Sequence, residues 1–379
     1  MSYKETRIAF LRVAVIHDAL LYMGGAERVF SAILRLYPTA DVYTAFLVPE
    51  LRGWVSRYTS GNVFVSPFDR IPYIRRFADW FKPAILFWWE SLDLSSYDLI
   101  ISSSHSFSAK SVIVPDGVTH VSYVHTPPRY MYNEYNESRW TRHPLVKFLL
   151  KPVFFWMKKK DYIAAQRPDV IIANSKTVQQ RIKRYYSRDS VVIYPPIYVP
   201  PKAVLRDRKP TYFLCVSRLV KQKGIDLAIR ACDELKLPLV IVGTGPQEAY
   251  LRSIAGPTVI FLGFVSDDKM AEAYRKARAL LYCSRDEDFG MAPVEAMAHG
   301  VPVIGYSSGG VRETVADGKT GTLFSRYSAS YLEQSIKIFL MRSWSAEACR
   351  RQATRFSERR FANEFIKIVS RVLNQKEKL

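Results

Sequence analysis

Cysteine is scarce in this chain of 379 residues, which contains only four. They lie far apart, with no close pair and no histidine at ligand spacing: Cys215, Cys232, Cys283 and Cys349. The sequence therefore predicts neither a disulfide framework nor a zinc site. A reducing cytoplasm is the simplest setting for such a protein.

Long apolar runs are also missing. No uninterrupted apolar run reaches the roughly 18 to 20 residues of a membrane-spanning helix. Residues 1–10 are too few and too polar for a signal peptide, so we expect a soluble or peripheral protein. Because 379 residues exceed the size at which one hydrophobic core usually stops growing, two domains are expected.

Acidic residues are few relative to basic ones: 35 Asp and Glu stand against 55 Lys and Arg, which gives a formal net charge of +20. Such an excess indicates nucleic acid, an anionic membrane or a phosphorylated substrate as the partner. Between residues 139 and 188, thirteen Lys or Arg stand against two acids and are interleaved with Leu, Phe and Trp. Residues 70–90 repeat the mixture.

These two segments predict contact with the headgroups of an anionic membrane, where each basic residue contributes about 1 kcal/mol. The alternative is that the aromatic residues belong to the core and the charges are solvated. Nucleic acid is not expected, because no RRM, KH, zinc-finger or helix-turn-helix signature accompanies the charge.

Apolar runs bounded by turn residues alternate with segments of helical spacing. The runs expected to form strands in the first half are residues 11–17, 97–103, 119–125, 169–175 and 191–195. After a proline-rich stretch the alternation restarts with residues 211–217, 237–243, 258–263, 279–284 and 301–305. Alternation of strand and helix predicts parallel sheets covered on both faces.

We therefore expect an α/β protein of two doubly wound, Rossmann-like domains that face a cleft. The predicted boundaries are an N-terminal domain at 1–195, a linker at 196–210, a C-terminal domain at 211–355 and a last helix at 356–379. The apolar stripe of that helix should pack on a domain. Ligands of open parallel sheets sit beyond the carboxyl ends of the strands, so the natural site is the cleft.

Two loops at expected strand ends are candidates for that site. Gly24 and Gly25 directly precede a helical segment, so their backbone N–H groups could approach a phosphate or a sugar, although they could equally form a tight turn. Arg218 and Lys223 follow the first strand of the second domain. They could neutralise a diphosphate there, or be solvated cations.

A third loop contains the sequence "SRDEDFGMAPVEAMAHGVPVIG". Glu287 and Glu295 stand eight positions apart in it, and a helix is expected to begin between them. The backbone N–H groups of Gly290, Met291 and Ala292 could bind an anion at the positive end of that helix. Glu295 gains from the helix dipole without any ligand, whereas Glu287 is better explained as an acceptor for sugar hydroxyls.

The stretch "EDFGMAPVEAMAHGVPVIG" resembles the signature of two glutamates separated by seven residues in the retaining glycosyltransferases of family four. Around it, "SRLVKQKG", "IVGTGPQEAYL", "VIFLGFVSDDKMAEAYRKARALLYCS" and "GGAE" occur in that family's order and approximate spacing. The resemblance covers nearly the whole chain. It implies a GT-B fold whose C-terminal helix crosses back to the first domain, and transfer from a nucleotide sugar with retention of configuration. It implies no metal and no other cofactor.

Under this resemblance, the first domain binds the acceptor and the second binds the nucleotide sugar. Glu287 matches a glutamate that contacts the donor sugar and is implicated in catalysis, and Glu295 matches one on the ribose hydroxyls. Arg218 and Lys223 match the cations on the leaving diphosphate. The other residues implied in donor binding are Gly24, Gly25, Gly243, Gly245, Phe264, Val265, Phe289, Gly290, Met291 and Ala292.

Histidines at expected strand ends complete the candidate site. His125 falls where related mannosyltransferases carry a histidine next to the donor sugar, so it joins the predicted catalytic group. His105 and Arg129 are candidate acceptor contacts. Each histidine could instead be an ordinary hydrogen-bonded loop residue.

Asp286 and Asp288 form an Asp-X-Asp triplet, which in a different glycosyltransferase fold would hold a divalent metal. We do not expect a metal here, because the triplet lies in the glutamate signature and because Arg218 and Lys223 can supply the positive charge. The role of the two aspartates stays open.

The segments around Gly24 and His125 look like those of bacterial O-antigen and exopolysaccharide mannosyltransferases. This favours GDP-mannose as donor and an oligosaccharide on a polyprenyl diphosphate as acceptor, with the enzyme peripheral on the cytoplasmic face of the inner membrane. With no carboxylate obviously placed as a nucleophile, front-face attack with the leaving phosphate as base is expected. The alternatives are a UDP- or dTDP-sugar donor, an epimerase or phosphorylase of GT-B fold, and a non-catalytic membrane-associated scaffold.

Overall fold

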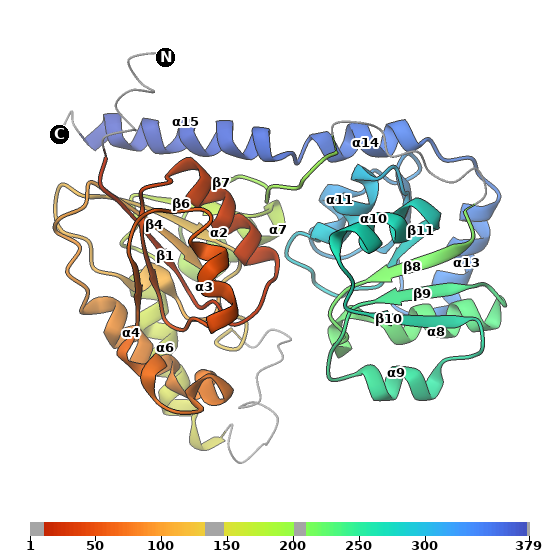
Figure 1. Ribbon diagram of the computed structural model, residues 1–379, viewed down its shortest axis with the longest axis horizontal. Coiled ribbons are helices and arrows are strands. Elements are labelled where there is room, and N and C mark those ends of the chain that lie inside the picture. The colour runs from red at the N-terminus through yellow and green to blue at the C-terminus, as the bar shows by residue number, and fades with distance from the viewer. Residues whose placement is uncertain (1–10, 133–147, 201–209, 377–379) are drawn as a thin grey trace. The chain divides into compact units, whose positions relative to one another are not determined.

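The computed structural model describes residues 11–132, 148–200 and 210–376. The chain divides into two compact units. Unit 1 comprises Met1–Tyr194 and Phe361–Leu379, and unit 2 comprises Pro195–Arg360 (Figure 1). The predicted leader at 1–10, residues 139–147 of the basic segment and residues 201–209 of the predicted linker lie outside the described residues.

Unit 1 is built on a parallel sheet that has seven strands in the described residues, in the order β3-β2-β1-β4-β5-β6-β7. Its strands are β1 (Val13–His17), β2 (Asp41–Thr44), β3 (Val63–Val65), β4 (Leu99–Ser104), β5 (Thr119–Val124), β6 (Val170–Ala173) and β7 (Val191–Val192). Its helices are α2 (Gly25–Leu36), α3 (Pro49–Val55), α4 (Lys82–Glu90), α6 (Lys151–Ala164), α7 (Lys176–Tyr186) and most of α15 (Glu358–Lys376), with 3₁₀ turns at η1 (Pro67–Arg70), η2 (Ile74–Phe81) and η3 (Ala109–Ser111).

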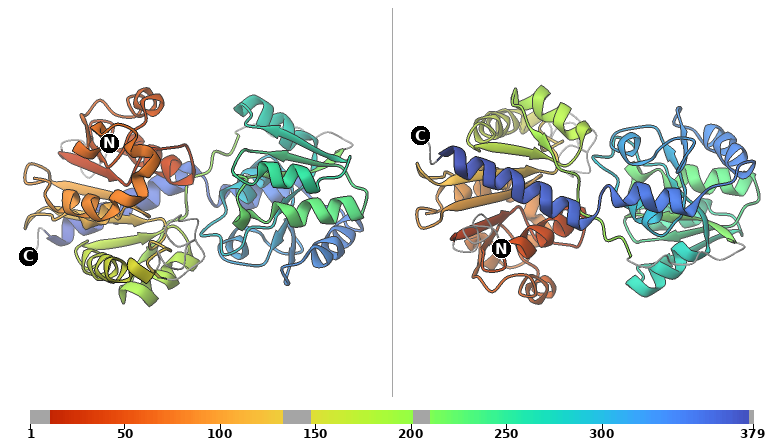
Figure 2. Two further views of the ribbon diagram at one scale, coloured as in Figure 1. Left: turned by 90° about the horizontal axis from the view of Figure 1, so that it is seen from below. Right: turned by 90° about the horizontal axis from the view of Figure 1, so that it is seen from above.

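Unit 2 repeats this architecture with six strands in its described residues, in the order β10-β9-β8-β11-β12-β13. The strands are β8 (Tyr212–Val216), β9 (Leu239–Val242), β10 (Val259–Gly263), β11 (Ala277–Tyr282), β12 (Val303–Tyr306) and β13 (Gly321–Phe324). The helices are α8 (Ile225–Glu234), α9 (Glu248–Ile254), α10 (Asp267–Lys276), α11 (Met291–Ala298), α12 (Val311–Thr314), α13 (Ala329–Leu340) and α14 (Ala346–Thr354), with a 3₁₀ turn at η5 (Lys221–Lys223). Helices lie on both faces of each sheet (Figure 2).

The central strands are continuous apolar runs because both faces of each sheet are covered. All five residues of β1 and all six of β5 are buried. Capping residues mark both ends of α7. At its start the backbone N–H of Val178 donates to Ser175 Oγ at 3.1 Å, and at its end Ser187 adopts the left-handed conformation. The expected α/β fold of two Rossmann-like sheets is confirmed.

Each sheet has a point at which the strand order reverses. In unit 1, β1 pairs with both β2 and β4, so the chain winds outward in opposite directions from the β1–β4 pair. In unit 2, β8 pairs with both β9 and β11. The two helices that flank such a reversal leave a crevice at the carboxyl ends of the two central strands, where doubly wound proteins bind ligands. The structure therefore directs attention to the loops after β1, β4, β8 and β11.

The last helix, α15, supplies core residues to unit 1. Phe361, Phe365, Ile368 and Val369 are buried in the same apolar cluster as strands β1 and β4. Near its end, Lys376 Nζ lies 2.9 Å from a carboxylate oxygen of Asp169. The chain thus leaves unit 1 after Tyr194 and returns to it with this helix.

The described part of the predicted linker packs within unit 2. Ile197 is buried, and its backbone N–H donates to Phe356 O at 2.9 Å. Arg350 donates to the carbonyl oxygen of Pro200 at 2.8 Å. Residues 195–200 therefore run beside the segment that follows α14. No helix in the described parts of the chain is long and apolar enough to cross a bilayer.

Candidate active site

The reversal point of unit 2 joins one cation to one carboxylate. Lys223 ends the 3₁₀ turn after β8, and Glu287 lies in the loop after β11. Lys223 Nζ donates to Glu287 Oε2 at 2.6 Å, and the two side chains are 23% and 22% exposed. The pair is thus partly shielded yet still reachable from solvent. A small pocket beside it is lined by the ends of β8 and β11.

Three groups hold the Glu287 carboxylate. Besides Lys223, Ser284 Oγ donates to Glu287 Oε2 at 2.5 Å, and the Tyr282 hydroxyl forms a further hydrogen bond. Burial alone would raise the pKa of Glu287, but the charge of Lys223 and these hydrogen bonds outweigh it and lower the pKa to about 2. Glu287 is therefore ionised at neutral pH. It can accept hydrogen bonds from hydroxyl groups but has no proton to donate.

Glycines allow the loops around this pair to approach one another. A Cβ on Gly309, whose φ is +58°, would lie 2.1 Å from the carbonyl oxygen of Glu287. A Cβ on Gly310 would lie 2.4 Å from Phe289 Cα, and the Gly310 N–H donates to Glu287 O at 2.8 Å. Only glycine fits at either position. The Gly309–Gly310 turn therefore fixes the backbone that carries Glu287.

Helix α11 begins directly after this loop. Gly290 precedes it in the left-handed conformation, with φ of +86°, and the predicted N-terminal residues Met291 and Ala292 are half-buried. Glu295 lies one turn into the helix, half-buried, and its charge raises the pKa of Tyr282 together with burial and Glu287. The two glutamates of the signature therefore share Tyr282 as a neighbour.

Other predicted donor residues of unit 2 have different surroundings. The Phe289 ring is buried and packs edge-on against Phe356 at 5.4 Å, so its side chain belongs to the core. A Cβ on Gly243 would lie 1.9 Å from Ser217 O, and one on Gly245 would lie 2.5 Å from Leu219 O. These glycines let the loop after β9 lie directly against the loop after β8.

Arg218 is exposed on the loop after β8. Phe264, directly after β10, is 87% exposed, and Val265 beside it is half-buried. An aromatic ring as exposed as Phe264 gains nothing from packing within the described chain, which suits a residue that stacks on a ligand.

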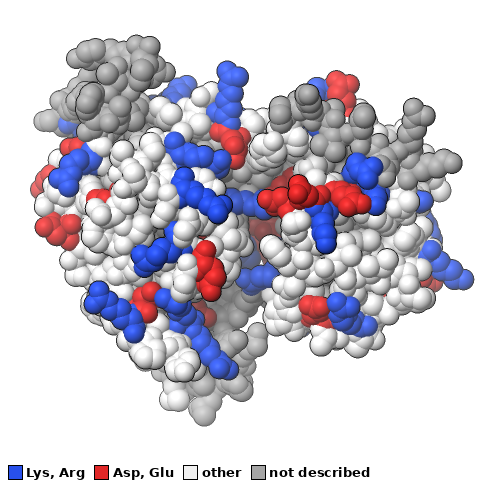
Figure 3. Space-filling model, viewed as in Figure 1, with Lys and Arg blue, Asp and Glu red and all other residues white. Residues whose placement is uncertain are grey.

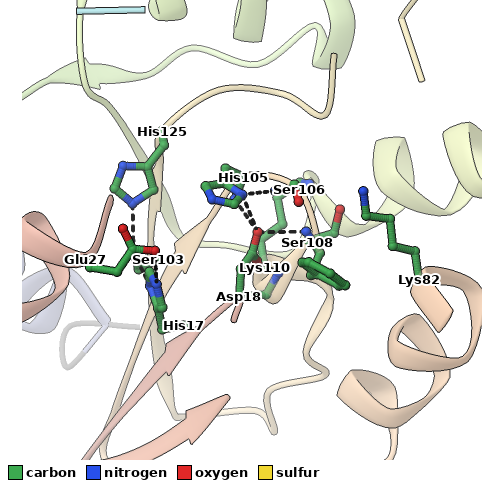
Figure 4. A network of polar contacts seen from close by, with 12 residues as sticks. His17, Asp18, Glu27, Lys82, Ser103, His105, Ser106, Ser108, Lys110 and His125 are labelled. Carbon is green, nitrogen blue, oxygen red and sulfur yellow. Dashed lines mark hydrogen bonds and ion pairs between the residues drawn. The ribbon is translucent and has the colours of Figure 1, made fainter. Parts of the chain in front are cut away.

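The reversal point of unit 1 gathers polar side chains from three strands (Figure 4). His17 ends β1 and is followed by Asp18, Ser103 lies near the end of β4, and His105 and His125 follow β4 and β5. Polar groups buried at this depth require partners. They form two sets of contacts.

The first set joins Asp18 to His105. Asp18 is fully buried and accepts the backbone N–H groups of His105, Phe107 and Ala109, each at 2.7 Å. His105 Nδ1 lies 3.0 Å from Asp18 Oδ2, and its side chain is 22% exposed. Burial would lower the pKa of His105, but the hydrogen bond and charge of Asp18 outweigh it and raise the pKa. Burial acts on Asp18 in the opposite sense and is also outweighed, so its pKa is lowered.

The second set joins His125 to the interior. Ser103 Oγ lies 2.9 Å from His125 Nε2 and 3.0 Å from His17 Nδ1. His17 Nε2 in turn lies 3.7 Å from Glu27 Oε1, and the Glu27 side chain is 3% exposed. Burial lowers the pKa of His125 well below its ordinary value, and the neighbouring His105 lowers it further.

Gly24 and Gly25 lie at the start of α2, next to Glu27 of this second set. A Cβ on Gly24 would lie 3.0 Å from Glu27 Oε2, so the absence of a side chain lets the turn close over the carboxylate. Arg129, in the loop after His125, is half-buried.

Asp286 of the Asp-X-Asp triplet has a structural role in the loop. Asp286, with φ of +50°, exchanges two hydrogen bonds with Ser308, each 3.1 Å long. These bonds tie the Glu287 loop to the Gly309–Gly310 turn. Among the residues that the structure describes, no cluster of three or more His, Cys, Asp or Glu could hold a metal ion.

Sequence reasoning missed several residues that the fold brings into these sites. They are His17, Asp18, Glu27, Ser103, Tyr282, Ser284, Gly309 and Gly310. A signal existed for some of them. The "HD" pair ends an expected strand, and "SSGG" follows another. No signal in the sequence pointed to Ser103, because it lies inside a serine-rich strand end.

Two family models match consecutive parts of the chain. Residues 23–199 match the model for Glycosyltransferase Family 4, and residues 201–356 match the model for Glycosyl transferases group 1. Together with the two Rossmann-like sheets, these matches define the class as GT-B glycosyltransferases. The two models together cover most of the chain, and they support the superfamily of group 1 and family 4 glycosyltransferases.

Curated relatives match only in part. An uncharacterized glycosyltransferase of Methanocaldococcus jannaschii is 30% identical over 178 residues, which are 46% of this chain and 50% of the relative. A GDP-mannose-dependent alpha-(1-6)-phosphatidylinositol monomannoside mannosyltransferase of Mycolicibacterium smegmatis is 36% identical over 127 residues, which are 29% of this chain and 33% of the relative. The chain thus spans half or less of the length of these two relatives.

A solved structure matches over nearly the full length. The Anabaena protein HepE in complex with UDP and glucose has a TM-score of 0.67 and 17% identity, covering 95% of this chain and 99% of that one. At this level of identity the likeness establishes the GT-B fold.

Proposed function

We propose that this protein is a retaining glycosyltransferase that moves mannose from GDP-mannose to a lipid-linked oligosaccharide in bacterial surface polysaccharide synthesis. The observation that carries the reaction type is the Lys223–Glu287 pair at the reversal point of unit 2. It combines a cation suited to a diphosphate with an ionised acceptor suited to sugar hydroxyls.

Cleavage at the anomeric carbon builds negative charge on the diphosphate and oxocarbenium character on the sugar ring. In the proposed reaction Lys223 and Arg218 offset the first charge, together with the N–H groups at the start of α11. Glu287 orients the sugar by accepting hydrogen bonds from its hydroxyl groups. The acceptor hydroxyl attacks from the same face, and its proton passes to the leaving phosphate oxygen.

GDP-mannose is favoured by the partial match to the mannosyltransferase of Mycolicibacterium smegmatis, whose name specifies that donor. A UDP-sugar is the second candidate, since HepE has the same fold and was solved with UDP and glucose. A thermal-shift titration with GDP, UDP, ADP and dTDP, with and without magnesium, separates the two, because a ligand that binds only the folded state raises its melting temperature. Stabilisation by GDP supports the proposal, stabilisation by UDP or dTDP instead overturns the donor, and no response to any nucleotide overturns the function.

Association with an anionic membrane is part of the proposal, and it rests on exposed side chains of unit 1. Within the segment 70–90, Ile74, Ile85 and Trp89 are buried in the core, as the alternative interpretation of that segment expected. Four aromatic residues of the segment are at least half-exposed: Tyr73 at 85%, Phe77 at 51%, Trp80 at 51% and Phe87 at 57%. Phe81 and Trp88 are partly buried and pack against the core. The core interpretation therefore holds for the three buried residues, and the four exposed aromatic residues carry the proposed membrane contact.

The second segment adjoins the first. The Phe87 ring stacks on Trp156 of α6 at 5.3 Å, and Lys160 of α6 donates to Glu90 at 2.8 Å. Three apolar residues in and just before α6 are more than half exposed: Phe148 at 63%, Leu149 at 65% and Phe155 at 74%. Exposed Lys151, Lys158 and Lys159 accompany them. We call these exposed residues of 73–87 and 148–159 the aromatic-basic surface. Figure 3 shows basic side chains, with some acidic ones, among uncharged residues on the face of unit 1 that it draws.

Such a surface fits a lipid headgroup layer, where aromatic rings insert and cations meet anionic lipids. Co-sedimentation with phosphatidylglycerol vesicles and with phosphatidylcholine vesicles tests this. We expect binding to the anionic vesicles only, and we expect it to be lost in a Phe77→Ser, Trp80→Ser double variant. Met341→Ser, which changes an apolar residue of unit 2 that is 84% exposed, is the matched control. Equal binding of the double variant and the control would remove the membrane from the proposal.

A further inference from the structure

A continuous buried path of polar side chains leads from the start of α2 to His125. It runs from Glu27 to His17 over 3.7 Å, from His17 to Ser103 over 3.0 Å and from Ser103 to His125 over 2.9 Å (Figure 4). His17 and Ser103 are fully buried, and His17 stacks on Phe30 with ring centroids 4.6 Å apart. We call these four residues the Glu27–His125 path.

The path has a direction, because Ser103 has a single hydroxyl proton. If Ser103 donates to His17 Nδ1, it must accept from an Nε2–H on His125. If it donates instead to His125 Nε2, it must accept from an Nδ1–H on His17. The proton on His17 therefore decides which nitrogen of His125 carries a hydrogen.

Glu27 biases that choice. His17 Nε2 is buried and has no hydrogen-bond partner among the described residues, and the Glu27 carboxylate oxygen is 3.7 Å away. A carboxylate attracts an N–H and repels a nitrogen lone pair. A proton on His17 Nε2 is therefore favoured, which leaves Nδ1 to accept from Ser103 and places a proton on His125 Nε2.

The other ring nitrogen of His125 then carries a lone pair. Figure 4 places this nitrogen on the side of the ring away from Ser103. The neighbouring His105 ring is 6.0 Å away, and Asp18 raises its pKa. The raised pKa of His105 favours its charged form, and a positive charge there disfavours protonation of His125. His125 is therefore the neutral acceptor of the two.

We propose that Glu27, acting through His17 and Ser103, fixes His125 in the tautomer whose Nδ1 accepts a hydrogen bond from a hydroxyl of the sugar substrate. Glu27, His17 and Ser103 are positioning residues, and His125 is the residue that contacts substrate. The contact with a sugar rests on the proposed function, whereas the tautomer does not. The same arrangement accounts for Gly24, since a side chain there would press on the Glu27 carboxylate.

Glu27 also occupies the first turn of α2, where a carboxylate stabilises the helix dipole. This structural role predicts a loss of stability on substitution but no change in a histidine tautomer. Glu50, an exposed glutamate in the first turn of α3, provides the matched control. The two roles are therefore separable by measurement.

The test uses the full chain with ¹⁵N-labelled histidine. Long-range ¹H–¹⁵N correlation spectra distinguish protonated from unprotonated ring nitrogens, and single His→Gln variants assign the six histidines. In the ligand-free protein we expect His125 to be protonated on Nε2. In Glu27→Gln and in Ser103→Ala we expect a mixture of tautomers, and in Glu50→Gln we expect the wild-type spectrum. Ser103→Ala breaks the path without touching α2, so a folding defect of the Glu27 variant does not compromise the test.

Kinetics supply the second measurement. With the nucleotide sugar that the protein uses, kcat/KM should fall about tenfold in both path variants, the order of magnitude expected for one hydrogen bond. An Nδ1–H tautomer in the wild type, including one produced by a doubly protonated His17, overturns the proposal. An unmoved tautomer together with full transfer activity also overturns the path. A shifted tautomer in a protein that transfers no sugar overturns the proposed function, and with it the substrate contact.

Discussion

Replacing Glu287 by Gln removes the charge that faces Lys223, and it should change how the stability of unit 2 depends on pH. The pKa of Glu287 is about 2 in the folded protein against an ordinary value of 4.5. A difference of this size corresponds to about 3 kcal/mol at neutral pH. The carboxylate is only 22% exposed, so this interaction is moderately shielded from solvent.

The sign follows from the lowered pKa. A carboxyl group with a depressed folded-state pKa contributes stability that is complete above its unfolded-state pKa and is lost as the pH falls toward the folded-state value. Between pH 7 and pH 3 the wild type should therefore lose about 2 kcal/mol through this group alone. Glu287→Gln should lack that component, and its free energy of unfolding should fall less steeply over the same range.

Trp344 makes the measurement specific to unit 2. It is the only one of the seven tryptophans in the sequence between residues 195 and 360, so its ¹⁹F signal after labelling with fluorotryptophan reports the unfolding of that unit. Urea titrations at pH 7, 5 and 3 then give the free energy of unfolding at each pH. Glu248→Gln, in an exposed pair with Arg252 at 2.9 Å, is the control and should keep the wild-type slope. If Glu287→Gln also keeps the wild-type slope, the reasoning about the shielded pair is wrong.

Three further outcomes follow from the contacts. Lys223→Met should raise the pKa of Glu287 toward its ordinary value, which ¹³C titration of the carboxyl group measures. The same variant should lower kcat with a nucleotide sugar by at least about 100-fold, while its circular dichroism spectrum stays unchanged. Gly309→Ala should destabilise unit 2 by about 1 to 3 kcal/mol in urea titration, because its φ is +58° and the new methyl meets the backbone of Glu287; wild-type stability would show that the turn can relax. Asp161→Asn should destabilise unit 1 by about 3 to 5 kcal/mol, since Lys110, which is ion-paired to that aspartate, would be left buried and unpaired. A melting temperature within a degree or two of wild type would contradict this.

The central strands could be predicted because their signal is local. Residues 119–125 and 211–217 are apolar runs with turn residues at both ends, and β5 and β8 occupy them to within one or two residues. Strand β2 and the edge strands β3 and β13 were missed. All three are only three or four residues long, and β3 and β13 are only partly buried. Pairing with a neighbouring strand, not their own composition, makes them strands.

For the candidate site, the sequence likewise indicated individual residues but not which of them lie together. Glu287, Glu295 and Lys223 could be selected because each lies in a recognisable pattern at an expected strand end. That Lys223 and Glu287 form one pair could not be predicted, since 64 positions separate them and only the β8–β11 pairing brings them together. Phe289 shows the converse: its pattern pointed to a ligand, but tertiary packing placed the ring against Phe356.

The sequence by itself determined the alternation of strand and helix, the charge of the chain and the positions of the glutamate signature, because these depend on residue type and spacing along the chain. The tertiary structure alone decided which polar groups share a buried environment. The Glu27–His125 path joins residues from α2, β1 and β4 and the loop after β5, and His17 and Ser103 are 86 positions apart. A pKa and a tautomer depend on distances and burial in three dimensions, and neither quantity exists until the sheet has brought its strand ends together.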